Sequence, residues 1–154
     1  MNNDIPPQSF RWVRLLGYSG LLPQVLALYL FLAGGEWGWI ALAGGFAYAA
    51  LIFSFLGGVW WGQSLANPDA PKWAYAAAVL PSLIGLGLFL PWTLGWAWPE
   101  PSLLWLGLFL MVSPLVDRKL GLGGSGWIQL RWHLSTGLGL LTFALGIVSL
   151  AVRP

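Results

Sequence analysis

The side chains best suited to chemistry stand at the ends of two successive apolar segments of the sequence. Asp117 and Arg118 close the first segment, and Arg131 and His133 open the second. We expect Asp117 to pair with Arg131 across the intervening loop and to fix the two helix ends. A second interpretation makes these four residues a site for an anion, such as a lipid headgroup or a cofactor carboxylate. His133 alone offers one ligand to a haem iron with no obvious second donor, so haem is disfavoured and no metal site is predicted.

A second group of polar and aromatic side chains falls within the apolar segments or at their ends. Prolines inside the first, third and fourth predicted helices would each free the carbonyl group four residues earlier, and in lipid that group needs another partner. Such kinks could enclose a groove for a ligand or partner, lined by Gln24, Tyr48 and Ser54, with Trp60 and Trp61 at its mouth. Simple tolerated bends are the alternative interpretation.

The composition excludes both a water-soluble globule and a disordered chain. Of the 154 residues, 58% are hydrophobic and 8% charged, whereas a soluble domain carries about a quarter charged residues. Disorder needs low hydrophobicity and high charge, but the mean hydropathy is +0.74. With no Cys, five acids and one His, the sequence contains no zinc spacing, phosphate loop or nucleophile elbow. We therefore expect a non-enzymatic membrane protein that forms a single domain over residues 1–154.

Five segments are long and apolar enough to be membrane helices. A spanning helix needs roughly 20 mostly apolar residues, because each residue rises about 1.5 Å through about 30 Å of hydrocarbon. The sequence therefore predicts an all-α, polytopic bundle of five transmembrane helices. Their predicted ranges are about 12–33, 39–66, 73–96, 102–116 and 132–152.

The distribution of cations predicts the orientation of these spans. With a cytoplasmic N-terminus, six of the seven cations lie inside, and only Arg153 lies outside with Glu36 and Glu100. The twelve tryptophans then divide between the two interfaces. We predict an N-in, C-out protein of a bacterial cytoplasmic membrane, because no Arg- and Ser-rich presequence is present. The six inner cations are Arg11, Arg14, Lys72, Arg118, Lys119 and Arg131.

Small residues recur at helical spacing and predict where helices pack. In lipid, helices associate through close backbone approach, which small side chains permit. These stripes predict a compact centre built from the second, third and fifth helices, and a homodimer face is the alternative. The residues concerned are Ala50, Ser54, Gly58 and Gly62 in the second helix and Gly139 and Gly146 in the fifth.

Several short motifs occur in a fixed order along most of the chain. They lie at residues 16–23 (LGYSGLLP), 54–62 (SFLGGVWWG), 80–82 (LPS), 117–118 (DR) and 130–131 (LR). With these motifs the sequence resembles an uncharacterised inner-membrane family, domain of unknown function 3429, which includes transmembrane protein 69 of mitochondria and small bacterial proteins. The position before the Trp-Gly pair is often polar or basic in that family, whereas here it is Trp60. The resemblance implies a five-helix membrane protein without established enzymatic activity, and it supplies no catalytic residue.

Two functions are consistent with the sequence. The first is a non-enzymatic accessory or assembly component of a membrane complex, whose partner is another membrane protein or a second copy. The second is a binding protein or carrier for an apolar ligand such as a quinone, lipid or porphyrin. We expect contact with membrane lipids, no bound nucleic acid and no resident cofactor, with haem or quinone as the less favoured possibilities.

Overall fold

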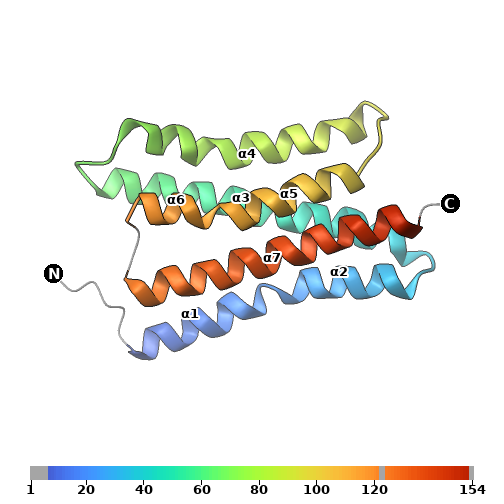
Figure 1. Ribbon diagram of the computed structural model, residues 1–154, viewed down its shortest axis with the longest axis horizontal. Coiled ribbons are helices and arrows are strands. Elements are labelled where there is room, and N and C mark those ends of the chain that lie inside the picture. The colour runs from blue at the N-terminus through green and yellow to red at the C-terminus, as the bar shows by residue number, and fades with distance from the viewer. Residues whose placement is uncertain (1–6, 122–123, 153–154) are drawn as a thin grey trace.

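The computed structural model describes residues 7–121 and 124–152, and among these residues it contains helices and no strand. The helices lie side by side in an elongated bundle (Figure 1). This arrangement confirms the predicted all-α fold. The helices are Pro7–Ser19 (α1), Leu22–Ala33 (α2), Trp37–Ala66 (α3), Lys72–Thr93 (α4), Glu100–Val112 (α5), Pro114–Lys119 (α6) and Ser125–Val152 (α7).

The helices make five spans, as predicted. Helices α1 and α2 together form the first span, and α5 and α6 form the fourth, whereas α3, α4 and α7 each form one alone. All five are long and apolar enough to cross a membrane. Helix α1 begins and α7 ends at opposite ends of the bundle (Figure 1), as an odd number of spans requires.

Helix α7 begins earlier than the sequence predicted. The glycines of residues 121–126 indicate a loop before a helix over 132–152. In the structure, α7 already starts at Ser125. Leu130 is buried against the bundle, and such tertiary packing offsets the low helix propensity of the neighbouring glycine. Arg131 consequently lies inside the helix rather than at its first turn.

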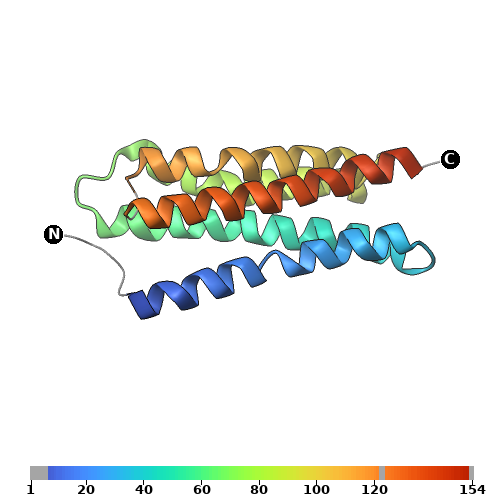
Figure 2. The same ribbon diagram turned by 60° about the horizontal axis from the view of Figure 1, so that its bottom comes forward.

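The first span is broken between α1 and α2. Pro23 has no N–H group, and the N–H of Gln24 donates to the carbonyl oxygen of Leu21 at 3.1 Å. The carbonyl oxygen of Gly20 is thereby released from the helical pattern, and it accepts a hydrogen bond from the hydroxyl of Tyr48 in α3. The span bends at this point (Figure 2), so α1 and α2 approach their neighbours at different angles.

A second break separates α5 from α6 at Pro114. The hydroxyl of Ser113 donates to the carbonyl oxygen of Leu110 at 2.8 Å, the group four residues before the proline. At each break a hydroxyl thus bonds a carbonyl that has left the helical pattern, that of Gly20 at the first and that of Leu110 at the second. By contrast, Pro81 and Pro91 lie inside α4, which continues through both.

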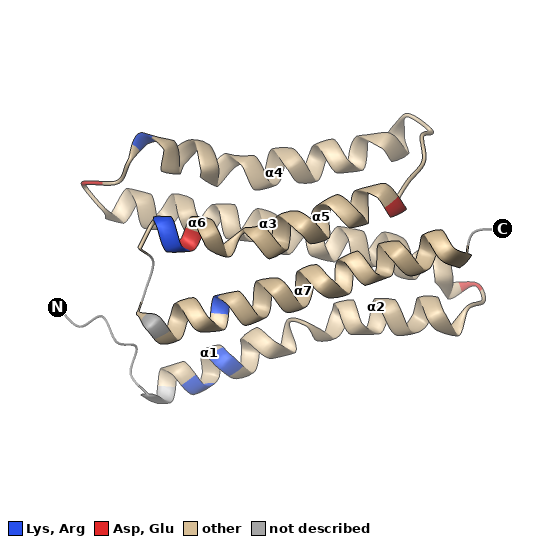
Figure 3. Ribbon diagram, viewed as in Figure 1, with Lys and Arg blue, Asp and Glu red and all other residues tan. Residues whose placement is uncertain are grey.

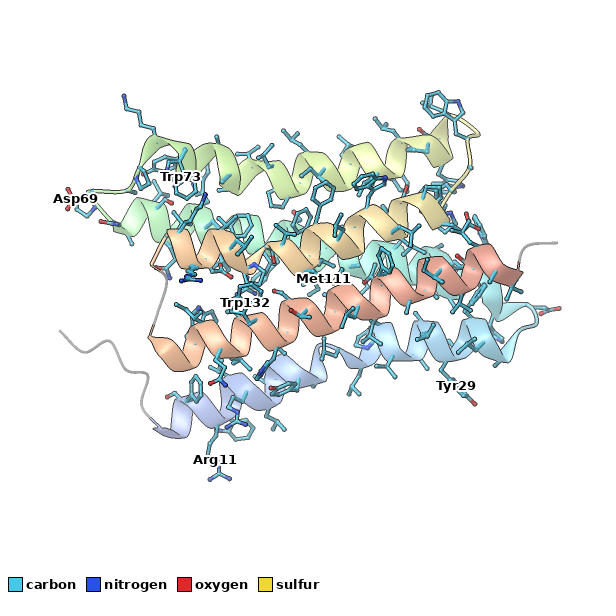
Figure 4. The ribbon with its side chains drawn as sticks, viewed as in Figure 1. Arg11, Tyr29, Asp69, Trp73, Met111 and Trp132 are labelled. Carbon is cyan, nitrogen blue, oxygen red and sulfur yellow. The ribbon has the colours of Figure 1, made fainter. Side chains whose placement is uncertain are left out.

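Helices α5 and α7 pack most closely, because glycines on both let the backbones approach. A Cβ added at Gly139 would lie 2.7 Å from the carbonyl oxygen of Gly107 and 2.5 Å from Cγ of Met111. One added at Gly146 would lie 3.1 Å from Cβ of Leu103. Figure 4 shows Met111 between the two helices. The sequence indicated Gly139 and Gly146 as packing residues of the fifth predicted helix. Both are on α7, and both lie at its contact with α5.

The centre of the bundle differs from the prediction. The fourth span, not the third, is the most enclosed: half of its apolar stretch is buried (50%), against 22% for α4. Its inward face consists of Leu103, Leu106 and Leu110, each fully buried. Large side chains on α5 fill the space that the small face of α7 leaves open. The prediction relied on small residues in every central helix. It therefore missed that the large side chains of α5 pack against the small face of α7.

Helices α3 and α4 meet at Gly57. A Cβ added there would overlap the carbonyl oxygen of Ala78 and lie 3.2 Å from Cγ of Pro81. About one turn earlier along α3, the hydroxyls of Ser54 and Ser82 form a hydrogen bond of 2.7 Å. A glycine at position 57 is therefore what allows these two helices to touch.

The predicted stripe on α3 does not pack as a unit, which corrects the sequence analysis. Ala50 and Ser54 face α4, where a Cβ added at Gly85 would lie 3.8 Å from that of Ala50. Gly58 and Gly62 are exposed, and nothing lies within 4 Å of a Cβ added at either. The reason is geometric: a spacing of four residues drifts by about 40° per step around a helix of 3.6 residues per turn.

The described cations gather towards one end of the bundle (Figure 3). They stand on α1, at the start of α4, at the end of α6 and in the first half of α7. The turn between α2 and α3, which holds Glu36, and the start of α5, which holds Glu100, lie at the other end (Figure 3). Arg153 lies outside the described residues. This asymmetry agrees with the charge pattern of the sequence, while the direction in which the bundle crosses a membrane stays a prediction.

The glycine contact gives a matched pair of variants. We expect Gly57→Leu to lower the free energy of unfolding by about 1–3 kcal/mol or to abolish folding, because the new side chain must push α3 away from Ala78. Gly58→Leu, one residue along and in open space, should unfold as the wild type does. Thermal unfolding of both proteins in mild detergent checks this. Equal loss in the two variants would contradict the α3–α4 contact.

Candidate functional site

The most deeply buried charged side chain among the described residues is that of Asp117, which is 1% exposed. Its Oδ2 accepts a hydrogen bond from Nε of Arg131 at 2.9 Å and lies 2.9 Å from Nη2 of the same guanidinium. Its Oδ1 accepts a hydrogen bond from the indole Nε1 of Trp60 at 2.6 Å. The predicted pairing of Asp117 with Arg131 is thus present, and Trp60 joins it as a third member.

Three separate spans position these side chains. The break before Pro114 starts the short helix α6, which carries Asp117 in its first turn. The early start of α7 places Arg131 well inside that helix. Trp60, 3% exposed, comes from α3. The hydroxyl of Ser113 also lies 3.4 Å from that of Ser135, which ties the α5–α6 break to α7 one turn beyond Arg131.

Burial makes this cluster energetically demanding. Moving two ions out of water costs several kcal/mol each, and their attraction compensates only when the geometry is good and further hydrogen bonds are made. Here each oxygen of Asp117 accepts one hydrogen bond, from Nε of Arg131 and from Nε1 of Trp60, and Nη2 of Arg131 adds an ion-pair contact. An ionisable residue inside a membrane span is also a candidate functional group, since it is expensive to keep there. The pair carries no net charge but several N–H donors.

The structure does not bring the four predicted anion-site residues together. Arg118 is exposed on α6, and no ion pair joins it to another described residue. His133 is exposed on α7, where its Nδ1 lies 3.3 Å from the hydroxyl of Tyr18 in α1. Arg131 is engaged by Asp117 rather than free to bind an anion. The predicted site therefore separates into a buried neutral pair and an exposed region on α1 and α7.

The structure does not bring the residues of the predicted groove together either. Tyr48 and Ser54 are six residues apart, so they lie about 120° apart around α3 and face different neighbours. Tyr48 reaches Gly20 in the break between α1 and α2, whereas Ser54 reaches α4. Trp60 is buried against Asp117. Trp61 is 43% exposed, and its ring packs edge-on against Tyr75 at 5.5 Å between centroids. No single groove contains all of these side chains.

Gln24 occupies a different place again. It is fully buried on α2, and a Cβ added at Gly45 of α3 would lie 3.5 Å from its Nε2. Neither of its amide atoms has a hydrogen-bond partner among the described residues. A buried, unpaired amide is costly. Gln24 lies beside α3 and lines neither of the two grooves described next, so its part in a ligand site stays a prediction.

Among the grooves that the described residues form, one is lined by the buried Arg131. It lies between α1, α3 and α7, has a volume of about 400 Å³, and is called the α1–α7 groove below. Its polar lining comes from Tyr48, Arg131 and Ser135. The carbonyl released at Gly20 stands at its wall. Apolar side chains complete the lining, among them Leu16, Ile52, Leu56, Leu110, Leu134 and Leu138.

Another groove lies between α3 and α4 and has a volume of about 510 Å³. Its polar side chains are Ser54 and Ser82, whose hydroxyls bond to each other. Aromatic rings line the end away from most of the cations, and Trp98 is packed edge-on against Phe46 at 5.2 Å between centroids. This groove thus offers apolar contact and no free charge. Its rings are Trp39, Phe46, Phe89, Trp92 and Trp98.

Sequence reasoning missed Ser135 and the role of Trp60. Ser135 follows Arg131 by four residues, and this spacing places both on one face of a helix. That signal was present in the sequence. The bond from Trp60 to Asp117 joins residues 57 positions apart and depends on how α3 and α6 are rotated against each other. Spacing within one helix does not reveal that rotation.

Five apolar spans, three of which meet at a buried aspartate and arginine pair, define a helical, multi-pass membrane protein. Residues 9–147 match the family model described as protein of unknown function, DUF3429. The chain therefore belongs to this family, as its motifs indicated, while its kinship with transmembrane protein 69 stays an expectation. The chain matches no curated protein and no solved structure.

The buried pair predicts a clear mutational pattern. Asp117→Asn should lower the free energy of unfolding by about 3–5 kcal/mol, because it leaves the guanidinium of Arg131 buried without a counter-charge. Combining it with Arg131→Met should recover most of that loss, since both charges are then gone. Denaturant unfolding in mild detergent measures both. A double variant less stable than Asp117→Asn alone would show that the arginine has a different partner.

Proposed function

We propose that this membrane protein is a non-enzymatic binding protein that holds an apolar molecule from the bilayer in the α1–α7 groove. The observation that carries the proposal is the combination of a largely apolar groove with a buried guanidinium at its wall. Small-molecule sites have this character, with mostly apolar walls and a few fixed polar groups that orient the ligand. We place the protein in a bacterial cytoplasmic membrane with its N-terminus inside, on the support of its cation distribution.

The polar groups favour a ligand whose head is neutral. Asp117 cancels the charge of Arg131, so the wall of the groove presents N–H donors without a net positive charge. The hydroxyl of Ser135 adds a further polar group beside it. A carbonyl oxygen accepts such hydrogen bonds and needs no counter-charge. A quinone, with two carbonyl groups on an apolar body, has this chemistry, and so does the ester group of a lipid.

Two serines of α7 provide a matched test. Ser135 lines the groove. Ser149 is buried on the same helix, and its hydroxyl donates to the backbone carbonyl oxygen of Gly146. We expect delipidated protein in mild detergent to bind decylubiquinone. Ser135→Ala should weaken that binding about fivefold, the effect of one hydrogen bond. Ser149→Ala should leave it unchanged. Equilibrium dialysis gives the three dissociation constants.

The proposal fails if decylubiquinone does not bind the wild type. It also fails if the two serine variants lose binding equally, because the effect would then not come from the α1–α7 groove. The unfolding temperatures of both variants, measured in the same detergent, show whether each protein is folded during the binding assay.

An accessory role in a membrane complex is the second candidate, and the exposed glycines of α3 favour it. Gly58 and Gly62 share a face four residues apart, and nothing in the described chain covers them. Two glycines at this spacing let another transmembrane helix approach closely. The partner is then a second copy of this chain or another membrane protein.

The absence of Cys from the sequence makes this role simple to test. We expect Gly58→Cys, treated with a short bis-maleimide in native membranes, to give a discrete cross-linked product. Leu83→Cys, on the exposed side of α4, is the matched control and should give none. The mass of the product distinguishes a second copy from another protein. Equal labelling at both positions without a product would argue against a partner on this face.

A further inference from the structure

A small pocket lies between α1 and α7 at the end of the bundle where the cations gather. Its volume is about 170 Å³, several times the roughly 30 Å³ that one water molecule occupies in the liquid. It is distinct from the α1–α7 groove, which is lined by other residues of the same two helices. Its polar lining consists of Arg14, Tyr18, Gln129 and His133, and Phe10 and Leu130 stand beside them.

The pocket carries uncompensated positive charge. No aspartate or glutamate is among the described residues that line it. The ion pair found in the described part of the chain joins Asp117 to Arg131, and no carboxylate among the described residues pairs with Arg14. This is the opposite of the situation at Arg131. An anion entering the pocket would meet a guanidinium that no carboxylate already holds.

The remaining polar groups are arranged as further donors. The hydroxyl of Tyr18 and Nδ1 of His133 form a hydrogen bond of 3.3 Å. When Tyr18 donates in this bond, the other ring nitrogen of His133 carries the proton and can donate to a ligand. The side-chain amide of Gln129 supplies N–H groups as well. Guanidinium, imidazole and amide donors around one small space match the oxygens of a phosphate group.

We propose that this pocket binds the phosphate group of an anionic phospholipid. The pocket is large enough for a phosphate group but too small for acyl chains as well. The remainder of the ligand must therefore lie outside it. On α1, Trp12 and Leu15 stand next to Arg14 and are 64% and 61% exposed, which gives an acyl chain an apolar surface beside the charged pocket. A basic residue near the membrane surface attracts anionic lipid with about 1 kcal/mol. This inference is independent of the α1–α7 groove and of its ligand.

Two cations at the same end of the bundle make the decisive comparison. Arg14 lines the pocket, whereas Lys72 stands at the start of α4 and lines neither this pocket nor the surface of Trp12 and Leu15. We expect native mass spectrometry of the wild type in mild detergent to retain phosphatidylglycerol in preference to phosphatidylcholine. Arg14→Gln should reduce the retained phosphatidylglycerol about fivefold. Lys72→Gln should retain it as the wild type does. Both side chains are exposed, so folding should not be affected.

A second arm of the experiment separates the lipid from free phosphate. Inorganic phosphate is added to the lipid-loaded protein at about a thousandfold molar excess over the lipid, and we expect the phosphatidylglycerol to stay bound. Displacement that depends on Arg14 would overturn the lipid assignment, because the pocket would then recognise phosphate alone. Equal loss in the Arg14 and Lys72 variants, or no preference for phosphatidylglycerol, would overturn the site itself. Denaturation curves of both variants confirm that each compared protein is folded.

Discussion

In hydrocarbon there is no water to bond a peptide group, so a helix can break only where another group of the chain replaces the lost hydrogen bond. Both helix breaks in this protein obey that constraint. The hydroxyl of Tyr48 bonds the carbonyl of Gly20, and the hydroxyl of Ser113 bonds that of Leu110. Gly20, Tyr48 and Leu110 all line the α1–α7 groove. The groove therefore lies where two spans depart from straight helices, and the same hydrogen bonds stabilise the bends and shape its walls.

The second break has a further consequence, because it aims α6 so that Asp117 points inward. That carboxylate accepts bonds from α3 through Trp60 and from α7 through Arg131. Three spans are thus joined at one end of the bundle. At the other end, Trp98 packs edge-on against Trp39 and Phe46 and holds the α4–α5 connection against α3. Polar bonds fix one end and aromatic packing the other, and both are needed because helices gain little hydrophobic driving force from each other in lipid.

The sequence was sufficient to predict the five spans and the pairing of Asp117 with Arg131. Spans are read from length and hydropathy, which are local properties, and the pair joins residues close to a single loop. The sequence was not sufficient to predict that Gly58 is exposed or that Trp60 bonds to Asp117. Those features depend on the rotation of α3 about its axis, and the neighbouring Gly57 would satisfy the same small-residue pattern. The predicted groove failed for the same reason, since Tyr48 and Ser54 stand on different faces of α3.

The two arginines that line the concave sites of α1 and α7 show why burial and charge must be considered together. Arg131 lies in low dielectric beside Asp117, so an anion that approached it would also meet that carboxylate. At an effective dielectric of about 20, two like charges about 5 Å apart repel with about 3 kcal/mol, which offsets much of the attraction to the guanidinium. A neutral acceptor avoids this repulsion. Arg14 is exposed and unopposed, so solvent weakens its attraction for an anion but no fixed charge cancels it. The two proposed sites on α1 and α7 thus differ in one respect: Asp117 faces Arg131 in the first, whereas no described aspartate or glutamate lines the pocket of Arg14.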